Sequence, residues 1–218
     1  MLRVGLTGGI ACGKTTVGEM FVKLGARLRQ ADQIARDLMQ PGQAVYDDVV
    51  QHFGRDILHP DGTINRARLA QEAFGSASHP SRIVELNRIV HPEVIRLQEK
   101  WMDEVEREDP SAVAIVEAAL ILEAYTAVPF DKLVVVTCTA DQRVERFAHR
   151  QKIDLATARA EVRRRMAAQL PDDEKVEAAR ERGGFEIDNS GTLENTERQV
   201  QKVWKKFAPG ALAPEVLQ

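Results

Sequence analysis

Apolar residues are distributed along the chain in two patterns, short continuous runs and longer stretches with helical spacing. The continuous runs predict β-strands, and those that are apolar throughout suit strands covered on both faces, as in a parallel sheet. The predicted strands are residues 2–6, 27–30, 113–116, 133–137 and 185–187. The second and the fifth of these are short and partly polar, so their pattern is the weakest.

Between the runs, apolar residues recur three and four positions apart, which predicts helices. The predicted helices are residues 15–24, 33–38, 43–53, 66–74, 81–90, 92–106, 141–150, 154–168, 171–182 and 193–207. Asp32 stands where it could cap the second of them, and Pro92 separates the fifth from the sixth. Strands that alternate with helices predict a doubly wound α/β fold.

Composition narrows the possible functions without identifying one. The chain has 30 Lys and Arg against 33 Asp and Glu, a formal net charge of −3, which argues against a nucleic-acid partner. No run approaches the ~18 apolar residues that a membrane span needs, and the N-terminus lacks the features of a signal peptide. Two cysteines fit a reducing compartment. We therefore expect a cytoplasmic protein with no membrane association.

The most specific motif follows the first predicted strand. It has the pattern G-x-x-x-x-G-K-[ST] and consists of Gly8, Gly9, Ile10, Ala11, Cys12, Gly13, Lys14 and Thr15, with Thr16 next. Main-chain amides of such a loop can surround phosphate oxygens, and the helix that follows directs its positive end at them. Lys14 would reach the β- and γ-phosphates and the Thr15 hydroxyl would ligate Mg²⁺. The motif predicts a site for ATP and Mg²⁺ but does not identify a reaction.

The sequence lacks the motifs of two classes of phosphate-loop protein, the GTPase switches and the motor ATPases. No Asn-Lys pair is available to read guanine, and the third strand ends Val116-Glu117-Ala118-Ala119 rather than in the Asp-Glu of motor ATPases. A small-molecule kinase remains, which needs an arginine-bearing lid and a carboxylate to orient the hydroxyl that accepts the phosphate. Residues 140–169 hold eight basic and four acidic residues, +4 in total, and suit a lid. For Asp32, spacing does not decide between a helix cap and the carboxylate.

A family resemblance then becomes visible over residues 3–203: the chain resembles the dephospho-coenzyme A kinase family. The loop with its flanks, Gly5-Leu6-Thr7-Gly8-Gly9-Ile10 and Gly13-Lys14-Thr15-Thr16-Val17, looks like the start of that family. Further segments are similar in order and spacing, namely Ala31-Asp32-Gln33-Ile34-Ala35-Arg36, Pro41-Gly42, Asp61-Gly62-Thr63-Ile64-Asn65-Arg66 with Leu69, Val90-His91-Pro92, Arg146, Arg150, Gln169 and Asp188-Asn189-Ser190-Gly191.

The resemblance implies transfer of the ATP γ-phosphoryl group to the ribose 3′-hydroxyl of dephospho-coenzyme A, the last step of coenzyme A synthesis. Asp32, Lys14 and Arg146 would then be the catalytic residues. ATP would be held by the phosphate loop through Thr16, by Arg146 and by Asn189, and Mg²⁺ by Thr15. Dephospho-coenzyme A would be held by Asp32, Arg66, His91, Glu117 and Leu120. The alternative for Arg66 is a surface charge at the start of a helix. The alternative for His91 is a packing residue at a helix end.

The same resemblance subdivides one expected domain, residues 1–207. A P-loop kinase core with a five-stranded parallel sheet flanked by helices would comprise residues 1–40, 111–139 and 183–207. A helical acceptor-binding insertion would comprise residues 41–110, a helical lid residues 140–182, and a frayed tail residues 208–218. We expect a monomer or small homo-oligomer that acts on small molecules.

Several positions depart from the family pattern. Ala11-Cys12 replaces Gly-Ser in the loop, and Gln30 replaces the first Asp of Asp-Ala-Asp. Glu117-Ala118-Ala119-Leu120 replaces Asp-x-Pro-Leu, and Gly183-Gly184 replaces Ala-Asp. An exposed Cys12 thiolate beside Lys14 would be sensitive to oxidation. Two alternatives stay open: another nucleoside or nucleotide kinase of this architecture, and a nucleotide-binding regulator without catalytic activity.

Overall fold

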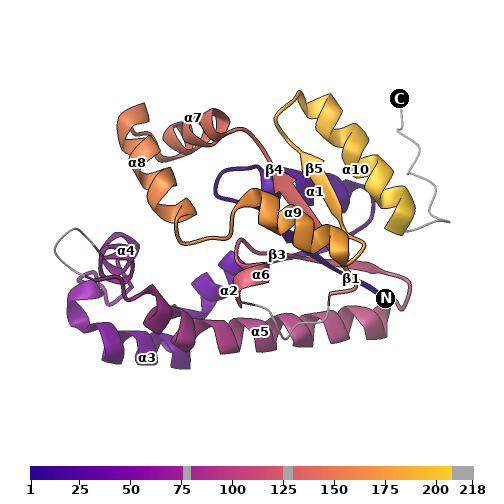
Figure 1. The fold of residues 1–218 in the computed structure, drawn as a ribbon. Coiled ribbons are helices and arrows are strands. Elements are labelled where there is room, and N and C mark those ends of the chain that lie inside the picture. The colour runs from indigo at the N-terminus through magenta and orange to yellow at the C-terminus, as the bar shows by residue number, and fades with distance from the viewer. Residues whose placement is uncertain (76–79, 125–129, 208–218) are drawn as a thin grey trace. The chain divides into compact units, whose positions relative to one another are not determined.

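The computed structural model describes residues 1–75, 80–124 and 130–207 (Figure 1). The chain divides into two compact units, one formed by Met1–Arg29 with Met102–Gln218 and the other by Gln30–Trp101. Helix α5, Ile83–Glu108, is continuous across the second boundary. The predicted limits of core, insertion and lid stay predictions, and the predicted frayed tail lies outside the described residues.

A five-stranded sheet has the order β2-β3-β1-β4-β5. Its strands are β1 (Leu2–Thr7), β2 (Arg27–Gln30), β3 (Val113–Glu117), β4 (Lys132–Thr137) and β5 (Phe185–Asp188). Strand β1 pairs in parallel with both β3 and β4, and β4 pairs in parallel with β5. The five predicted strands and the α/β class are therefore confirmed.

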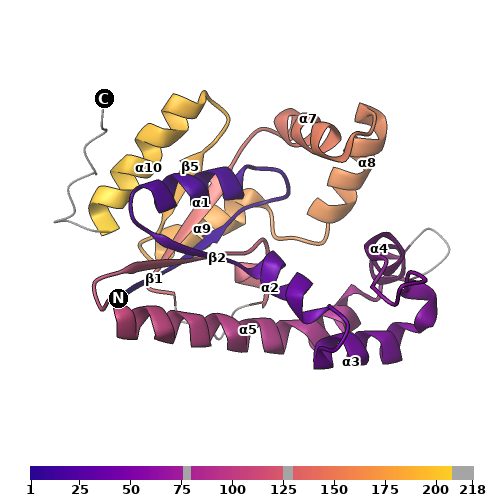
Figure 2. The ribbon, with the colours of Figure 1, turned by 180° about the vertical axis from the view of Figure 1, so that it is seen from behind.

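Helices cover both faces of this sheet. Helices α1 (Lys14–Lys23) and α10 (Leu193–Phe207) lie on one face (Figure 2), where Val4 and Leu6 of β1 are fully buried. Helices α9 (Asp172–Glu181) and α6 (Ile121–Ala124) lie on the other face (Figure 1). Successive residues of β1 point to opposite faces, so Gly5 lies against Ile121 while its neighbours face the α1 core.

Two helices of the predicted lid segment pack on the tip of the phosphate loop. Helix α7 (Ala140–Gln151) begins at a capping box in which Thr139 and Gln142 satisfy each other's main-chain amides, and α8 (Leu155–Met166) begins at the cap Asp154. Their apolar residues form a core cluster of their own that includes Ile10 of the loop. This cluster fixes α7 and α8 beside the phosphate-binding motif.

The second unit is helical. It contains α2 (Ala31–Leu38), α3 (Ala44–Phe53), the 3₁₀ turn η1 (Arg55–Ile57), α4 (Arg66–Phe74) and most of α5. Helix α4 begins where the side chain of Asn65 accepts hydrogen bonds from two main-chain amides of its first turn.

The structure excludes one of the two alternatives for Asp32, the helix cap, and shows that one local prediction is wrong. Strand β2 leads directly into α2, so Gln30 is the cap and Asp32 lies inside the first turn. The helices predicted on either side of Pro92 are a single helix, α5. Proline removes only one main-chain donor, and the buried Val90 and Val94 continue the apolar face on both sides of it.

The Gly183-Gly184 departure has a packing reason. Gly183 has φ 63°, a left-handed conformation that favours glycine. A Cβ atom on Gly184 would collide with the carbonyl oxygen of Leu133 in β4. The main chain therefore passes too close to the sheet for an aspartate at this position.

Candidate active site

The phosphate loop connects β1 to α1 and has the conformation that its glycines allow. Gly8 has φ 147° and Gly13, the residue before α1, has φ 97°. Ala11 has φ 56° and is one of two non-glycine residues with a left-handed main chain in the described part of the chain. The positive end of α1 is thus directed into the loop, as phosphate binding requires.

Lys14 and Thr15 are positioned by polar contacts at the start of α1. The ammonium group of Lys14 donates to the carbonyl oxygens of Gly8 at 3.0 Å and Gly9 at 3.1 Å. The hydroxyl of Thr15 donates to Oε1 of Glu117 at 2.9 Å. Glu117 is the last residue of β3 and is buried. The structure therefore brings together a loop lysine and a hydroxyl–carboxylate pair.

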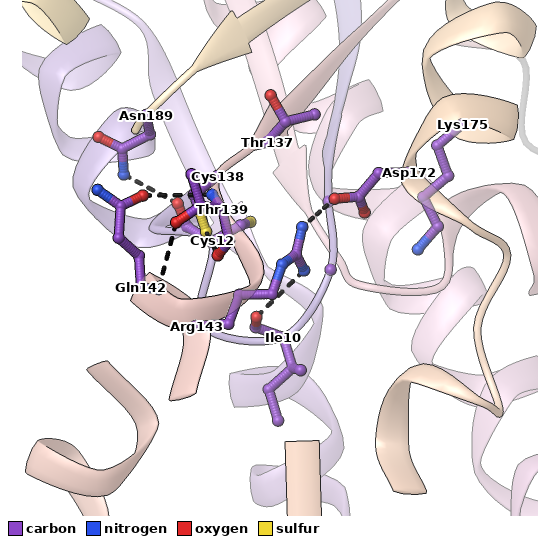
Figure 3. A network of polar contacts seen from close by, with 12 residues as sticks. Ile10, Cys12, Thr137, Cys138, Thr139, Gln142, Arg143, Asp172, Lys175 and Asn189 are labelled. Atoms are coloured by element: carbon purple, nitrogen blue, oxygen red, sulfur yellow. Dashed lines mark hydrogen bonds and ion pairs between the residues drawn. The ribbon is translucent and has the colours of Figure 1, made fainter. Parts of the chain in front are cut away.

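Arg146 of α7 and Asn189 contact the main chain of the loop at Cys12. Arg146 donates to the carbonyl oxygen of Cys12 at 3.3 Å and to that of Asn189 at 2.9 Å. Nδ2 of Asn189 donates to the same Cys12 oxygen at 2.8 Å (Figure 3), and its Oδ1 accepts from Thr196 at 2.9 Å. Both residues predicted to contact ATP therefore hold the loop itself.

Arg143, one turn before Arg146 on α7, is buried with 1% of its surface exposed. Its guanidinium donates to the carbonyl oxygen of Ile10 at 3.3 Å and forms an ion pair with Asp172 at the start of α9 (Figure 3). The sequence placed Arg143 among the eight basic residues of the lid segment, on one helix face with Arg146 and Arg150, and assigned it no contact with the loop. Asp172 had no sequence feature that pointed to the loop.

The segment that follows β3 is held by buried polar contacts. Lys175 of α9 is fully buried, and its ammonium lies 3.2 Å from Oε1 of Glu123 and donates to the carbonyl oxygen of Ala119 at 3.3 Å. Thr7 donates to the same oxygen at 3.3 Å. This places the predicted acceptor residue Leu120 in a fixed turn between Glu117 and Glu123.

The two cysteines are not arranged for reactivity at the loop. Cys12 is completely buried in the core between the sheet and α1, so the condition for its oxidation, an exposed thiolate, is not met. Burial raises the pKa of the Cys138 thiol, and the neighbouring Arg143 opposes this increase. Both thiols are free.

The remaining predicted residues belong to the second unit. Asp32 is exposed in the first turn of α2, Arg66 is exposed as the first residue of α4, and His91 is half-buried in α5. Partial burial and the positive charge of Arg36 lower the pKa of Arg66, and burial lowers the pKa of His91. A cavity of about 680 Å³ in this unit is lined by other residues, including Tyr46, Arg55, His59 and Arg68.

The described residues contain neither a cluster of metal-binding side chains nor a helix that could span a membrane. Within residues 1–75, 80–124 and 130–207, no group of three His, Cys, Asp or Glu side chains could hold a metal ion. Oxygen donors are nevertheless present in the Thr15–Glu117 pair, and Mg²⁺ commonly binds through few protein oxygens together with phosphates. In the same described residues, every helix is too short or too polar to span a membrane.

Comparisons with known proteins agree on one family. A family model described as dephospho-CoA kinase matches residues 2–195. A dephospho-CoA kinase from Geobacter metallireducens is 40% identical over 206 residues, which cover 94% of this chain and 96% of that protein. One from Corynebacterium glutamicum is 37% identical over 203 residues, with 93% and 96% covered.

Solved structures show the same fold. The protein TT1252 from Thermus thermophilus aligns with a TM-score of 0.72 at 27% identity, covering 94% of this chain and 97% of its own. The dephospho-CoA kinase from Campylobacter jejuni aligns with a TM-score of 0.56 at 22% identity, covering 95% and 97%. The likeness extends over nearly the whole of each chain.

Proposed function

The chain belongs to the dephospho-CoA kinase family, and from this premise we propose that its loop site transfers the γ-phosphoryl group of ATP to the ribose 3′-hydroxyl of dephospho-coenzyme A, which yields coenzyme A and ADP. The observation that supports this most is the agreement between the family match over residues 2–195 and the ordered phosphate loop at Gly8–Thr15.

The donor side of the reaction rests on Lys14 and the loop amides. Lys14 now donates to two loop carbonyls, and we expect its ammonium to exchange them for the β- and γ-phosphate oxygens of ATP. Arg146, which lies beside the loop at Cys12, would add positive charge as negative charge moves toward the leaving phosphate. Asn189 would support the loop by its bond to Cys12 rather than contact the nucleotide.

The Thr15 hydroxyl and the Glu117 carboxylate are the residues that would hold Mg²⁺. Their oxygens lie 2.9 Å apart at the start of α1, and hard oxygen donors suit this ion. When bound, the ion neutralises charge on the transferred phosphates. We therefore propose that Glu117, expected from the resemblance to contact the acceptor, would serve the metal instead.

The acceptor side is proposed from the family pattern. Asp32 would accept a hydrogen bond from the ribose 3′-hydroxyl and hold it in line for transfer, and its exposure leaves the carboxylate available. Arg66, His91 and Leu120 would contact other parts of dephospho-coenzyme A. A cytoplasmic location and a monomer or small homo-oligomer stay predictions.

A panel of acceptors tests the function. Release of ADP from ATP and Mg²⁺ would be measured with dephospho-coenzyme A, nucleosides, nucleoside monophosphates or no acceptor, each repeated with Mg²⁺ chelated. We expect release only with dephospho-coenzyme A and only with the metal. Release only with nucleosides or nucleotides would support a different kinase, and none with any acceptor a nucleotide-binding regulator.

A further inference from the structure

The phosphate loop of this chain carries an unusual residue at its tip. Ala11 has φ 56°, a conformation in which an L-residue with a Cβ atom is strained, and the family pattern has glycine there. A loop with alanine at this position therefore needs a contact elsewhere that holds the strained conformation.

Arg143 makes a contact at the right peptide bond. Its guanidinium donates to the carbonyl oxygen of Ile10, which belongs to the same peptide plane as the amide of Ala11. In a trans peptide, carbonyl and amide point in opposite directions. Because Arg143 holds the Ile10 oxygen, the Ala11 amide is turned away from Arg143. Among the described residues, that amide has no hydrogen-bond acceptor in the protein.

The Cys12–Gly13 peptide is also held by donors to its carbonyl oxygen. Arg146 and Asn189 both donate to the carbonyl oxygen of Cys12, whose peptide plane contains the amide of Gly13. This amide likewise has no acceptor within the described residues. Two loop amides are thus turned away from the donors that hold their carbonyl oxygens, and Figure 3 shows two of these donors, Arg143 and Asn189, at Ile10 and Cys12.

Burial and packing show that Arg143 is fixed in this position. Only 1% of its surface is exposed, and Asp172 at the start of α9 pairs with its other terminal nitrogen. The guanidinium passes so close to the loop that a Cβ atom on Gly9 would collide with it. Arg143 therefore connects the lid helix α7, the loop and α9.

We propose that Arg143, held by Asp172, is a positioning residue that keeps the Ile10–Ala11 peptide in its phosphate-binding orientation and so compensates for alanine in place of glycine at position 11. The inference rests on the proposed use of the loop for ATP. It assigns Arg143 no contact with the transferred phosphate.

The test compares nucleotide binding in two backgrounds. Calorimetry with the Mg²⁺ complex of a non-hydrolysable ATP analogue would be applied to wild type, Arg143→Gln, Ala11→Gly and the double variant. We expect Arg143→Gln to weaken binding about tenfold, the effect of losing one hydrogen bond from a charged donor. In the Ala11→Gly background, the same change should have almost no effect, because glycine adopts the left-handed conformation without strain.

Equal weakening in both backgrounds, or none in either, would overturn the proposal. If Arg143→Gln does not fold, Asp172→Asn replaces it, because Asp172 is partly exposed. Its weakening should be about threefold and should also vanish with Ala11→Gly. Arg180→Gln, which removes an exposed pair with Glu186, is the matched control and should bind as wild type. No acceptor is present, so a failure of the proposed reaction leaves this result unaffected.

Discussion

The loop region and the helical unit present their candidate residues in opposite ways. At the loop, Lys14, Thr15 and the carbonyls of Ile10 and Cys12 all have hydrogen-bond partners among the described residues. In the helical unit, Asp32 and Arg66 are exposed and, within the described residues, form no side-chain hydrogen bond or ion pair. One group of residues is held by contacts within the protein, and the other is open to solvent.

This difference in hydrogen bonding indicates that the two substrates need different kinds of binding site. A polyphosphate carries dense negative charge, and amides already turned toward it cost no reorganisation when it binds. A ribose hydroxyl is neutral, and in the proposed mechanism the single carboxylate of Asp32 would orient it, a role that needs access more than support. We therefore expect changes at the loop to affect ATP binding, and changes in the helical unit to affect transfer or acceptor binding.

Asp32→Asn is the substitution expected to separate the two regions most. The amide keeps the shape of the side chain but cannot accept the hydroxyl proton, so kcat should decrease about 100-fold or more. Binding of ATP, measured by calorimetry, should stay as in wild type. Asp48→Asn, another exposed carboxylate of the helical unit, is the control and should change neither quantity.

A kcat of Asp32→Asn close to that of wild type would remove Asp32 from the reaction. A large loss of ATP binding would instead contradict the division between the regions, because it would show that the helical unit takes part in holding the nucleotide.

His91→Gln gives the smallest expected effect, which concerns the stability of the protein without substrate. Burial lowers the pKa of His91 below its ordinary 6.5, so the unfolded chain takes up this proton first as the pH falls. The stabilising contribution of neutral His91 to the folded state is complete above its ordinary pKa of 6.5. This contribution is lost as the pH falls through the lowered pKa that His91 has in the folded protein.

Thermal unfolding of wild type and His91→Gln, measured from about pH 7.5 to about pH 5.5, checks this prediction. The Tm of wild type should decrease more over this interval, by about 1–3 °C. His59→Gln, with an exposed ring in the same unit, should behave as wild type. Equal slopes for wild type and His91→Gln would show that burial of His91 has no effect on stability.

Features with a local physical signature could be predicted from the sequence. Apolar runs located β1, β3 and β4, shorter and more polar segments gave the weaker predictions of β2 and β5, and the spacing of Gly8, Gly13 and Lys14 located the phosphate loop. Single residues were less informative: Asp32 left two alternatives open, of which the structure excludes the cap of α2, and Pro92 does not end its helix as predicted.

Contacts between distant parts of the chain could not be predicted. Arg143 was one arginine among several in a basic segment until the fold placed it between Ile10 and Asp172. The Lys175–Glu123 pair joins residues 52 positions apart in sequence, and no periodicity marks either of them. Long-range polar pairs of this kind are set by tertiary packing, which one sequence does not reveal.

The central claim is that the protein transfers phosphate to the ribose 3′-hydroxyl of dephospho-coenzyme A. The position of the new phosphate on the product tests this claim most directly. Purified protein would be incubated with ATP, Mg²⁺ and dephospho-coenzyme A, and the product examined by ³¹P NMR and fragmentation mass spectrometry. We predict one new phosphomonoester on the ribose 3′-oxygen, formed in equal amount with ADP. Phosphate at another position, or ADP with free phosphate and unchanged dephospho-coenzyme A, would contradict the claim.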